Sequence, residues 1–561
     1  DALTFDGDGT LSALTMVNTS DDTATVGVTE TGDVETLTIS SSDKTTAGVA
    51  KTLSIAKLTC DDLTKVNIVG SNAITISELD LVQASGSNSA SVTTANRAKV
   101  AVEFDASTST GNLSINTTEA GVIKVTGGSG VLDVDLNSTA TTSSTTLADV
   151  ITGGSATTDR VTLLDSGTAA TYYPNTSGVE IIEVETATGG AKTFSLKNTT
   201  GVTTVEITDP GGDGFGTTVS EINGHNVKII TNAGGGTDFS SQAIVLNTAT
   251  GVTNTDVEIS QSKTSSVPDA DPLHATVFST NSGAFTINDT AVDDSTTGNH
   301  YLDHAYTTDG TSSTAKLTSL TIKGGGDTDT STAKIDANTH TISTSANVNI
   351  STIDATEMVA NLNTVGMTLK SGATIKLGSA STTTTVDGLD LVADEVKFTD
   401  AGGTDILAAT SLATTNESAI RINSDGIETF KFDLTDDGGT TVASTFDVRD
   451  SVGLTKLQLS MLTDGSDVAG TFDKALTVSN LADGAQLVLA GTDSDGSVFG
   501  SGAGDVLTVD AAISGASSVT VSNASTAALT VFDLTFGTTY KTATVDQESE
   551  IDAVFTTAQG S

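Results

Sequence analysis

The sequences GVEIIEVET at residues 178–186 and GVTTVEITD at residues 201–209 decide the fold class. In both, a Gly-Val pair leads into a run in which Val and Ile alternate with Thr and Glu, the period of a strand with one apolar face. Related units are DVETLTIS at 33–40, GVTNTDVEIS at 251–260 and GIETFKFDL at 426–434. Because the spacing between them varies, we interpret these units as degenerate repeats that each lead into a strand.

Short alternating runs of the same kind recur along the chain, bounded by Gly, Asn, Asp or Ser. In the first part of the chain they cover residues 2–5, 13–17, 23–28, 35–40, 51–56, 65–69, 73–77, 99–104, 112–116, 122–126 and 131–136. Residues 317–336 couple a strand, a Gly/Asp turn and a second strand. This pattern predicts an all-β protein. The segment 356–366 is an exception, because its apolar residues have helical spacing and predict a short helix.

The charge of the chain excludes several classes of function. Its 561 residues include 70 acidic residues against 24 Lys and Arg, a formal net charge of -46. Such a chain repels nucleic acids and anionic membrane surfaces. A hydrophobic content of 36% is nevertheless too high for a disordered acidic tail, so the chain should fold. The acidic residues are 53 Asp and 17 Glu, and Asp favours turns over helices.

A parallel β-solenoid fits this composition better than stacked β-sandwiches. Sandwich domains usually bury a Trp or Tyr, whereas this chain has no Trp and only 4% aromatic residues. A solenoid instead stacks Val, Ile and Leu in narrow interior ladders, with Thr and Ser outside. We therefore expect an all-β fold made largely of parallel β-solenoid or β-helix-like coils, with β-sandwich-like modules as the alternative for part of the chain.

The distribution of Pro, Tyr and His predicts three regions. All four prolines, four of the five tyrosines and four of the five histidines lie between about residues 171 and 306. Because Pro and Tyr require specific turns and a bulkier core, we expect a separate β module at 171–310. Solenoid regions are then expected at 1–170 and 311–561.

Three further features concern disulfides, membranes and processing. The single Cys60 cannot form an intramolecular disulfide, and we expect it to be buried in its strand-like surroundings. No run approaches 18 apolar residues, so we expect no transmembrane segment. The chain begins at Asp1 without Met or a basic and apolar leader, and we expect it to be part of a longer protein.

Turns rich in Asp and Gly are the candidate metal sites. Ca²⁺ takes about six to eight oxygen ligands, and a tight turn with carboxylates two residues apart and Gly carbonyls supplies several of them. The candidate calcium ligands are Asp6, Asp8, Asp209, Asp213, Asp327, Asp329, Asp436, Asp437, Asp493, Asp495 and Asp505. None of these turns completes the EF-hand pattern, and a metal-free hairpin turn is the alternative for each.

One of these segments resembles a known calcium motif. Residues 491–510 resemble the calcium-binding nonapeptide repeats of the RTX family, GGxGxDxUx with U apolar. SGAGDVLTV at 501–509 approximates one unit, and GGSATTDRVTL at 153–163 and AGGTDILAA at 401–409 are looser versions. The glycine spacing is shifted, Asp505 comes one position early and no tandem run follows. We therefore expect scattered single calcium sites rather than a long RTX β-roll.

The whole chain is similar in composition to a family of surface proteins. Its richness in Thr, Ala, Gly, Asp and Ser, its acidity, the near absence of Cys and Trp, the GVE-strand units and the Asp-Gly turns resemble surface-layer (S-layer) proteins that Gram-negative bacteria export by the type I (RTX) route. This resemblance implies an extracellular protein that assembles with its own copies into a two-dimensional, calcium-stabilised lattice at the cell surface. It also implies attachment to lipopolysaccharide through a separate region, which is not evident here.

Two other functions remain open from the sequence. An RTX-type adhesin or biofilm matrix protein would share the composition, and a polysaccharide-active β-helix enzyme would share the fold. Such enzymes usually line a groove with aromatic and basic residues, whereas this chain has four Arg and no Trp. Carboxylate pairs are too numerous to single one out, and we interpret His300, Asp303 and His304 as a polar surface patch. We expect a structural protein without catalytic residues.

Overall fold

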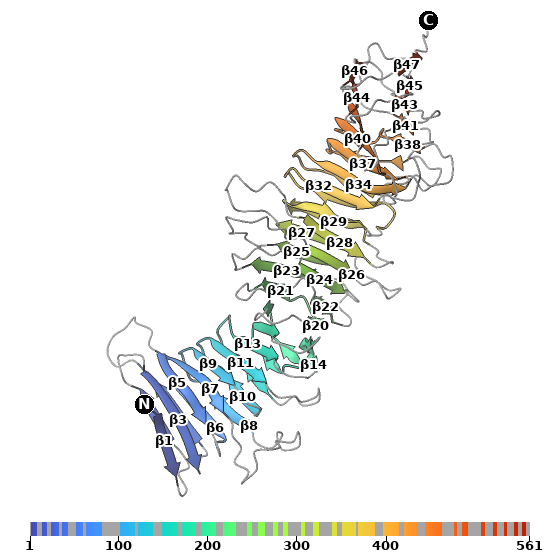
Figure 1. Cartoon of the computed structure of the whole chain (residues 1–561). Helices are drawn as coiled ribbons and strands as arrows, with labels where there is room; N and C mark the ends of the chain where they lie inside the picture. Colours follow the sequence, from blue (N-terminus) through green and yellow to red (C-terminus); the bar gives the residue numbers. More distant parts are fainter. Residues whose placement is uncertain are drawn as a thin grey trace. The chain divides into compact units, whose positions relative to one another are not determined.

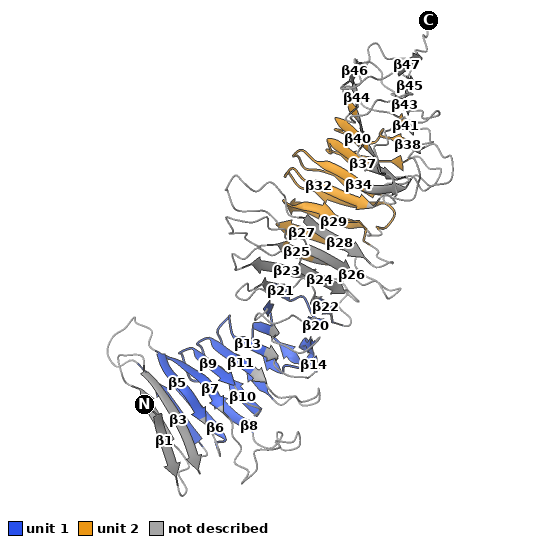
Figure 2. Cartoon of the chain, in the orientation of Figure 1, with its two compact units in different colours: residues 1–269, 274–277 blue, residues 270–273, 278–561 orange. Residues whose placement is uncertain are grey.

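The computed structural model describes thirty-one segments of the chain: residues 2–7, 14–18, 24–32, 36–42, 52–59, 63–80, 101–117, 122–138, 149–165, 171–186, 192–208, 217–231, 244–249, 256–263, 273–278, 284–289, 304–308, 318–324, 339–344, 350–365, 369–387, 396–413, 420–435, 444–462, 476–479, 485–491, 507–510, 520–523, 532–535, 544–547 and 553–556. They belong to two compact units, residues 1–269 with 274–277 (unit 1) and residues 270–273 with 278–561 (unit 2) (Figure 2). The predicted boundaries near residues 170 and 310 stay predictions.

Unit 1 is built from ladders of parallel strands (Figure 1). The first ladder pairs, in this order, β1 (Ala2–Gly7), β3 (Ala24–Gly32), β5 (Thr52–Thr59), β7 (Ala73–Asp80), β9 (Leu113–Thr117), β11 (Leu132–Ser138), β13 (Arg160–Asp165), β16 (Ile181–Thr186), β19 (Thr204–Thr208), β21 (Asn226–Thr231) and β23 (Asp256–Lys263). The second pairs β2 (Leu14–Asn18), β4 (Thr36–Ser41), β6 (Lys65–Gly70), β8 (Ala101–Asp105), β10 (Val122–Thr126), β12 (Val150–Thr152), β15 (Thr176–Ser177) and β18 (Thr199–Thr200). The third pairs β14 (Thr171–Tyr172), β17 (Lys192–Ser195), β20 (Thr217–Ile222) and β22 (Ile244–Thr248), and β24 (Leu273–Phe278) contributes His274–Val277 to this unit.

Unit 2 follows the same plan of parallel ladders. The first pairs β25 (Ala284–Asp289), β27 (Ser319–Gly324), β29 (Thr352–Met358), β31 (Ala373–Leu377), β33 (Val396–Thr399), β36 (Asn423–Asp425) and β39 (Ser451–Val452). The second pairs β26 (His304–Thr308), β28 (Thr339–Thr344), β30 (Asn361–Asn363), β32 (Thr383–Asp387), β34 (Ile406–Ala413), β37 (Thr429–Thr435), β40 (Lys456–Leu462), β42 (Gln486–Gly491), β44 (Thr520–Asn523) and β46 (Thr544–Gln547). Shorter ladders pair β35 (Ile420–Arg421), β38 (Ser444–Asp447), β41 (Leu476–Ser479) and β43 (Leu507–Asp510), and β45 (Phe532–Thr535) with β47 (Ala553–Thr556).

The prediction of an all-β, parallel β-solenoid is therefore confirmed. Every predicted strand in the first part of the chain overlaps a strand of the structure, and the only helix among the described residues is the short 3-10 helix Leu196–Asn198. We call one full turn of the chain around the solenoid a coil. Each coil adds one strand to each ladder that it joins, because parallel strands require a long connection back to the same edge.

The core consists of apolar side chains that stack in register on successive coils. In unit 1, Val134, Val161, Ile182, Val205 and Val227 occupy one row across five neighbouring strands, and all are fully buried. The residues on either side of each member point outward, which explains the alternation in the sequence. In-register packing thus converts a degenerate sequence repeat into a continuous hydrophobic core.

In unit 2 the interior row is bulkier. Phe430 and Phe432 on β37 stack at 5.7 Å between ring centroids, and Phe432 stacks on Phe446 at 5.9 Å. All three rings are fully buried. They fill a core whose neighbouring coils contribute Leu407 and Leu457 in register with Phe430. The solenoid therefore accommodates aromatic residues without a sandwich architecture.

The predicted helix at 356–366 is wrong. Its described residues, 356–365, include the end of β29, then a corner, then β30. Met358, Ala360 and Leu362 are buried, whereas Val359 and Val365 are exposed, at 47% and 37% of their full accessible surface. Alternation around a corner produced an apolar spacing that resembles a helical one. Of the predicted strand pair in 317–336, the first is β27, and the second lies outside the described residues.

A glycine at one corner of unit 1 is required by the close stacking of coils. Gly70 has a φ of 122°, and a Cβ there would lie 1.9 Å from the carbonyl oxygen of Ser41 on the coil below. Gly178 also has a positive φ, of 63°, but the nearest atom to its Cβ would be 3.8 Å away. The two positions share the conformational constraint and differ in steric space.

We expect Gly70→Ala to destabilise unit 1 by about 3 kcal/mol or more, because strain and a backbone clash add. Gly178→Ala should cost only about 1 kcal/mol, from the positive φ alone. Because opening in a solenoid is local, amide hydrogen exchange measures each loss around its own site, in β4 and β6 for Gly70→Ala and in residues 149–165 and 171–186 for Gly178→Ala. Equal loss of protection in the two variants would contradict the stacking explanation.

Candidate functional site

Two turns, one in each unit, place a buried aspartate directly before a strand. Asp159 precedes β13 and Asp405 precedes β34, and both side chains are fully buried. Each carboxylate accepts a hydrogen bond from the backbone of the preceding coil. Oδ1 of Asp159 accepts from the Leu132 N–H at 2.8 Å, and Oδ1 of Asp405 accepts from the Thr382 N–H at 2.7 Å. The two aspartates therefore satisfy backbone donors that lie where one strand of the preceding coil begins.

The glutamate of the Gly-apolar-Glu unit completes the same corner from the following coil. The Asp159 N–H donates to Oε2 of Glu180 at 3.0 Å, and the Asp405 N–H donates to Oε2 of Glu428 at 2.8 Å. The apolar residue before each glutamate, Val179 or Ile427, is fully buried. The recurring sequence unit thus has a physical role: it anchors a corner in the core and caps a backbone donor of the coil before it.

A threonine on the coil after that extends the corner. The hydroxyl of Thr203 donates to the carbonyl oxygen of Glu180 at 3.2 Å, and that of Thr455 donates to the carbonyl oxygen of Glu428 at 3.1 Å. The backbone N–H groups of the same threonines donate to the same carbonyls at 2.8 Å. Four successive coils in each unit are therefore joined by equivalent hydrogen bonds. The two corners are structural counterparts, one per unit.

The counterparts differ in the turn that precedes the buried aspartate, which reads GGSATTD at 153–159 and DAGGTD at 400–405. Thr152 pairs with Ser177 and Thr399 pairs with Asp425, so Gly153 and Asp400 occupy equivalent positions one residue further along. In unit 1, Oδ2 of Asp159 accepts from the Gly154 N–H at 2.6 Å. In unit 2, Oδ2 of Asp405 and Oδ1 of Asp400 are both buried, and neither accepts a hydrogen bond from an N–H group or a hydroxyl among the described residues.

The charges of these two carboxyls interact. Burial raises the pKa of Asp405 to about 6, with the neighbouring Asp400 adding to the rise against the opposing hydrogen bonds from Thr382. Burial also raises the pKa of Asp400, and the charge of Glu428 contributes. A second carboxylate has been placed where the counterpart corner has a glycine. The turn from Asp400 to Asp405 is our candidate functional site.

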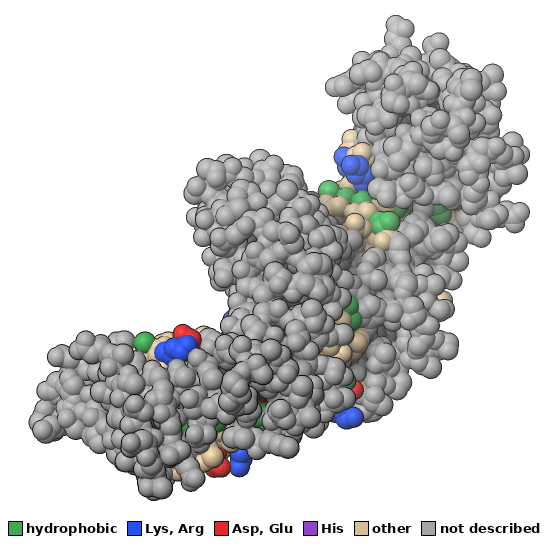
Figure 3. Space-filling model, turned by 60° about the horizontal axis from the view of Figure 1, so that its bottom comes forward, with side chains coloured by type: hydrophobic (Ala, Val, Ile, Leu, Met, Phe, Trp, Pro, Cys, Tyr) green, Lys and Arg blue, Asp and Glu red, His purple; other side chains and the backbone are tan. Residues whose placement is uncertain are grey.

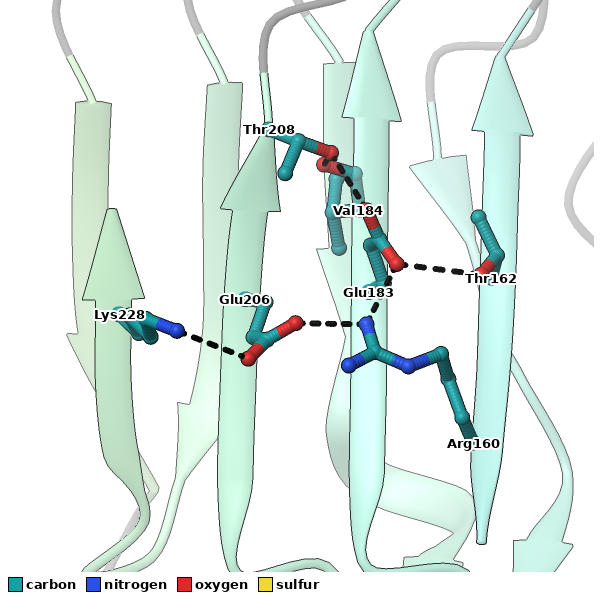
Figure 4. A network of polar contacts seen from close by, with 7 residues as sticks. All are labelled: Arg160, Thr162, Glu183, Val184, Glu206, Thr208 and Lys228. Carbon is teal, nitrogen blue, oxygen red and sulfur yellow. Dashed lines mark hydrogen bonds and ion pairs between the residues drawn. The ribbon is translucent and has the colours of Figure 1, made fainter. Parts of the chain in front are cut away.

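A second acidic cluster lies on the outer face of the first ladder of unit 1 and is neutralised within the chain (Figure 4). Arg160 Nη1 lies 2.5 Å from Oε2 of Glu183 and 2.6 Å from Oε2 of Glu206, and Lys228 Nζ lies 3.5 Å from Oε1 of Glu206. Burial alone would lower the pKa of Arg160, but Glu206 and Glu183 outweigh it and raise that pKa. Arg160 therefore stays charged and joins three strands.

The neighbouring strand of this face carries Asp133 and Asp135. Burial raises the pKa of both carboxyls, and the charge of Asp135 adds to the rise at Asp133. Oδ1 of Asp133 and Oδ1 of Asn116 are buried and lack a hydrogen-bond partner within the described segments. Both side chains are only half-buried, and Arg160 offsets part of the charge at Asp133. We therefore interpret the cluster as a set of ion pairs that stabilises the surface of the solenoid.

Most candidate ligands predicted from the sequence are not tested by the structure. Asp6 lies in β1, and Asp8, Asp209, Asp213, Asp327, Asp329, Asp436, Asp437, Asp493, Asp495 and Asp505 lie outside the described residues. Cys60, His300 and Asp303 also lie outside them, and His304 begins β26. Within the described segments, no group of three or more His, Cys, Asp or Glu side chains is arranged to hold a metal ion.

The sequence reasoning did not single out Asp159, Asp400 or Asp405, although the first and last lie in the two looser RTX-like segments. The available signal was a Gly-Gly pair, an Asp directly before a strand, and a Gly-apolar-Glu unit that follows on the next coil. The aspartate and the glutamate of this signal lie 21 residues apart in unit 1 and 23 residues apart in unit 2. Only the coil register brings them together.

Comparisons with known proteins give no further guide. No family model, no curated protein and no solved structure matches this chain. None of the described residues belongs to a helix with the length and apolar character needed to cross a membrane.

The Asp400–Asp405 pair should make the stability of unit 2 depend on pH. The folded pKa of Asp405, about 6, lies above its ordinary value of 3.8, so the folded state binds the proton more tightly. In metal-free buffer this contribution to stability therefore rises as pH falls from about 7 to about 4, by up to about 3 kcal/mol, and is constant below that. Asp400→Ala should remove the part of this pH dependence that the neighbouring carboxyl contributes and stabilise unit 2 at neutral pH, whereas the larger part, which comes from burial of Asp405, should stay.

Hydrogen exchange of residues 396–413 at several pH values measures this difference. Acidification also relieves general repulsion in an acidic chain, so the informative quantity is the difference between wild type and variant. An identical pH profile in the two proteins would contradict coupling between the carboxyls.

Arg160→Met should destabilise unit 1 by about 2 to 3 kcal/mol, because Glu206 is only 10% exposed and would lose its bridging partner. Lys57→Met is the matched control: Lys57 pairs with Glu78 at 2.5 Å, but the two side chains are 44% and 39% exposed. That change should cost less than about 1 kcal/mol. Denaturant unfolding of the full chain compares the two, and equal effects would rule out a special role for the buried network.

Proposed function

We propose that this chain is a structural protein of the cell surface, secreted from the cell, that assembles with its own copies into a calcium-stabilised S-layer lattice. The role is architectural rather than enzymatic. Two features of the chain suit this role: the stacked coils form a repetitive scaffold, and the acidic surface requires counter-ions.

The observation that carries the proposal is the in-register stacking of acidic side chains. Glu183 and Glu206 lie directly opposite each other on neighbouring strands. Parallel strands are about 4.8 Å apart, so like charges at such positions repel unless a cation lies between them. Here Arg160 and Lys228 provide that charge. The face drawn in Figure 3 likewise has described basic side chains beside acidic ones.

The chain cannot neutralise itself in this way throughout. Even if each of its 24 basic residues paired with one acidic residue, 46 of the 70 acidic residues would keep their charge. Two copies of such a polyanion pack closely only when cations lie between them. Calcium suits this role, because it binds carboxylate and carbonyl oxygens, and extracellular sites work at about 10⁻⁴ to 10⁻³ M.

The proposal predicts that purified protein forms ordered sheets in calcium at about 10⁻³ M and disperses when a chelator is added. Negative-stain electron microscopy and analytical ultracentrifugation measure the assembly. Restoring calcium should rebuild the sheets.

Sodium chloride at matched ionic strength is the control, because general screening would then act without a specific ion. Sheets or filaments that persist unchanged in excess chelator would refute a calcium-dependent lattice. A protein that stays monomeric in calcium yet binds a particular glycan or surface would favour an adhesin instead.

A further inference from the structure

The turn between β33 and β34 contains two buried carboxyl oxygens without donors. Asp405 is fully buried, and its Oδ1 is occupied by both the N–H and the hydroxyl of Thr382, each at 2.7 Å. Neither its Oδ2 nor Oδ1 of Asp400 accepts a hydrogen bond from an N–H group or a hydroxyl among the described residues. The two carboxyl groups lie within hydrogen-bonding reach of each other, so one forms a hydrogen bond to the other when it carries a proton. A buried carboxylate oxygen without a donor is costly, so this arrangement needs a ligand or a proton.

The counterpart corner in unit 1 shows that a corner of this kind forms without a second carboxylate. There the Asp159 carboxylate caps the preceding coil, and the Asp159 backbone carbonyl accepts the Ile181 N–H of the following coil, as the Asp405 carbonyl accepts the Thr429 N–H. Gly153 occupies the position of Asp400. Both carboxylate oxygens of Asp159 have backbone donors, from Leu132 and Gly154. In unit 2 the Asp400 carboxylate stands where unit 1 has Gly153, and Oδ2 of Asp405 has no counterpart of the Gly154 N–H donor.

The atoms beside the turn that can bind a cation are oxygens. A Cβ at Gly403, whose φ is 126°, would lie 2.8 Å from the carbonyl oxygen of Ala380 and 3.0 Å from Oδ2 of Asp405. The Ala380 carbonyl oxygen and Oδ2 of Asp405 therefore lie beside the same small space next to Gly403, which a side chain at that position would fill. The Gly402 N–H donates to Oδ2 of Asp400 at 2.9 Å and leaves Oδ1 available.

The charged groups that face the turn from the following coil are also acidic. Glu428 is oriented by the Asp405 N–H, and Asp425 is exposed and accepts the Asp400 N–H through its backbone carbonyl. No ion pair joins Asp400 or Asp405 to a Lys or Arg within the described segments. Oxygen-only donors with an excess of negative charge suit a hard divalent cation.

We propose that Oδ1 of Asp400 and Oδ2 of Asp405 bind one divalent cation, with the Ala380 carbonyl and water completing its coordination. The proposal rests on the proposed function only in naming the ion as calcium. The ion would hold the turn of one coil against the coil before it, since Ala380 precedes β32 and the two aspartates flank the turn before β34.

A shared proton is the competing explanation. One proton between the two oxygens would also satisfy both, but it would hold the pair only in acid, because at neutral pH two negative charges remain. A cation offsets both charges there. The two explanations therefore differ in what stabilises the turn at neutral pH.

The test uses the full chain under conditions where it is monomeric, at about pH 7.5, with calcium as the probe. Asp400→Ala removes one proposed ligand and leaves the Asp405 cap intact. Asp425→Asn is the matched control, because it removes one negative charge from the same corner at an exposed position. Equilibrium dialysis counts the bound calcium, and hydrogen exchange reports on residues 396–413.

We expect wild type and Asp425→Asn to bind the same number of calcium ions, and Asp400→Ala to bind one fewer. Calcium should slow exchange in residues 396–413 at least tenfold in wild type and leave Asp400→Ala unchanged. An equal calcium count in all three proteins, or protection of this segment by acid but not by calcium, would overturn the site in favour of a shared proton.

The outcome is separable from that of the lattice proposal, because the binding is measured on monomers. Calcium bound at this turn in a protein that never assembles would support the site and refute the lattice. A calcium-dependent lattice formed equally well by Asp400→Ala, with an unchanged calcium count, would support the lattice and overturn the site.

Discussion

Strict register between parallel strands is the constraint on which the rest of this structure depends. Because each residue lies about 4.8 Å from its equivalent on the next coil, every property of a position is repeated along the ladder. For Val134, Val161 and Val205 this repetition produces a core. For Glu183 and Glu206 it brings like charges together, and Arg160 must lie between them. The same rule thus creates both the stability of the solenoid and its electrostatic cost.

The two Asp corners show one way in which the chain uses acidic side chains without adding free surface charge. The Asp159 and Asp405 corners satisfy backbone donors with side chains from adjacent coils, through Asp159 and Glu180 in unit 1 and through Asp405 and Glu428 in unit 2. The glutamates act here as backbone caps and not as free surface charges. Acidic residues in such a chain therefore fall into three groups: those that cap backbone donors, those that pair with Arg or Lys of the chain, and those that must be neutralised from outside.

The sequence was sufficient for the fold class and for strand positions, because alternation of Val and Ile with Thr records directly which side of a strand is buried. It failed at 356–366, where Met358 and Leu362 are buried in different strands around a corner. The pairing of Asp400 with Asp405 was not predictable in the same way. It depends on how one turn folds back between two ladders, and on the absence of the backbone donor that Asp159 receives from Gly154. Most Asp-Gly turns named from the sequence lie outside the described residues and stay predictions.

The capping of the Asp159 and Asp405 corners by the following coil also gives the solenoid a direction. The N–H of Asp159 or Asp405 finds its carboxylate acceptor only after the coil that carries Glu180 or Glu428 has been laid down. A coil at the advancing end of a partly folded chain is therefore incompletely bonded, and the next segment of polypeptide completes it. Folding in such a chain therefore propagates from one coil to the next, and its cooperativity arises from contacts between neighbouring coils along the axis.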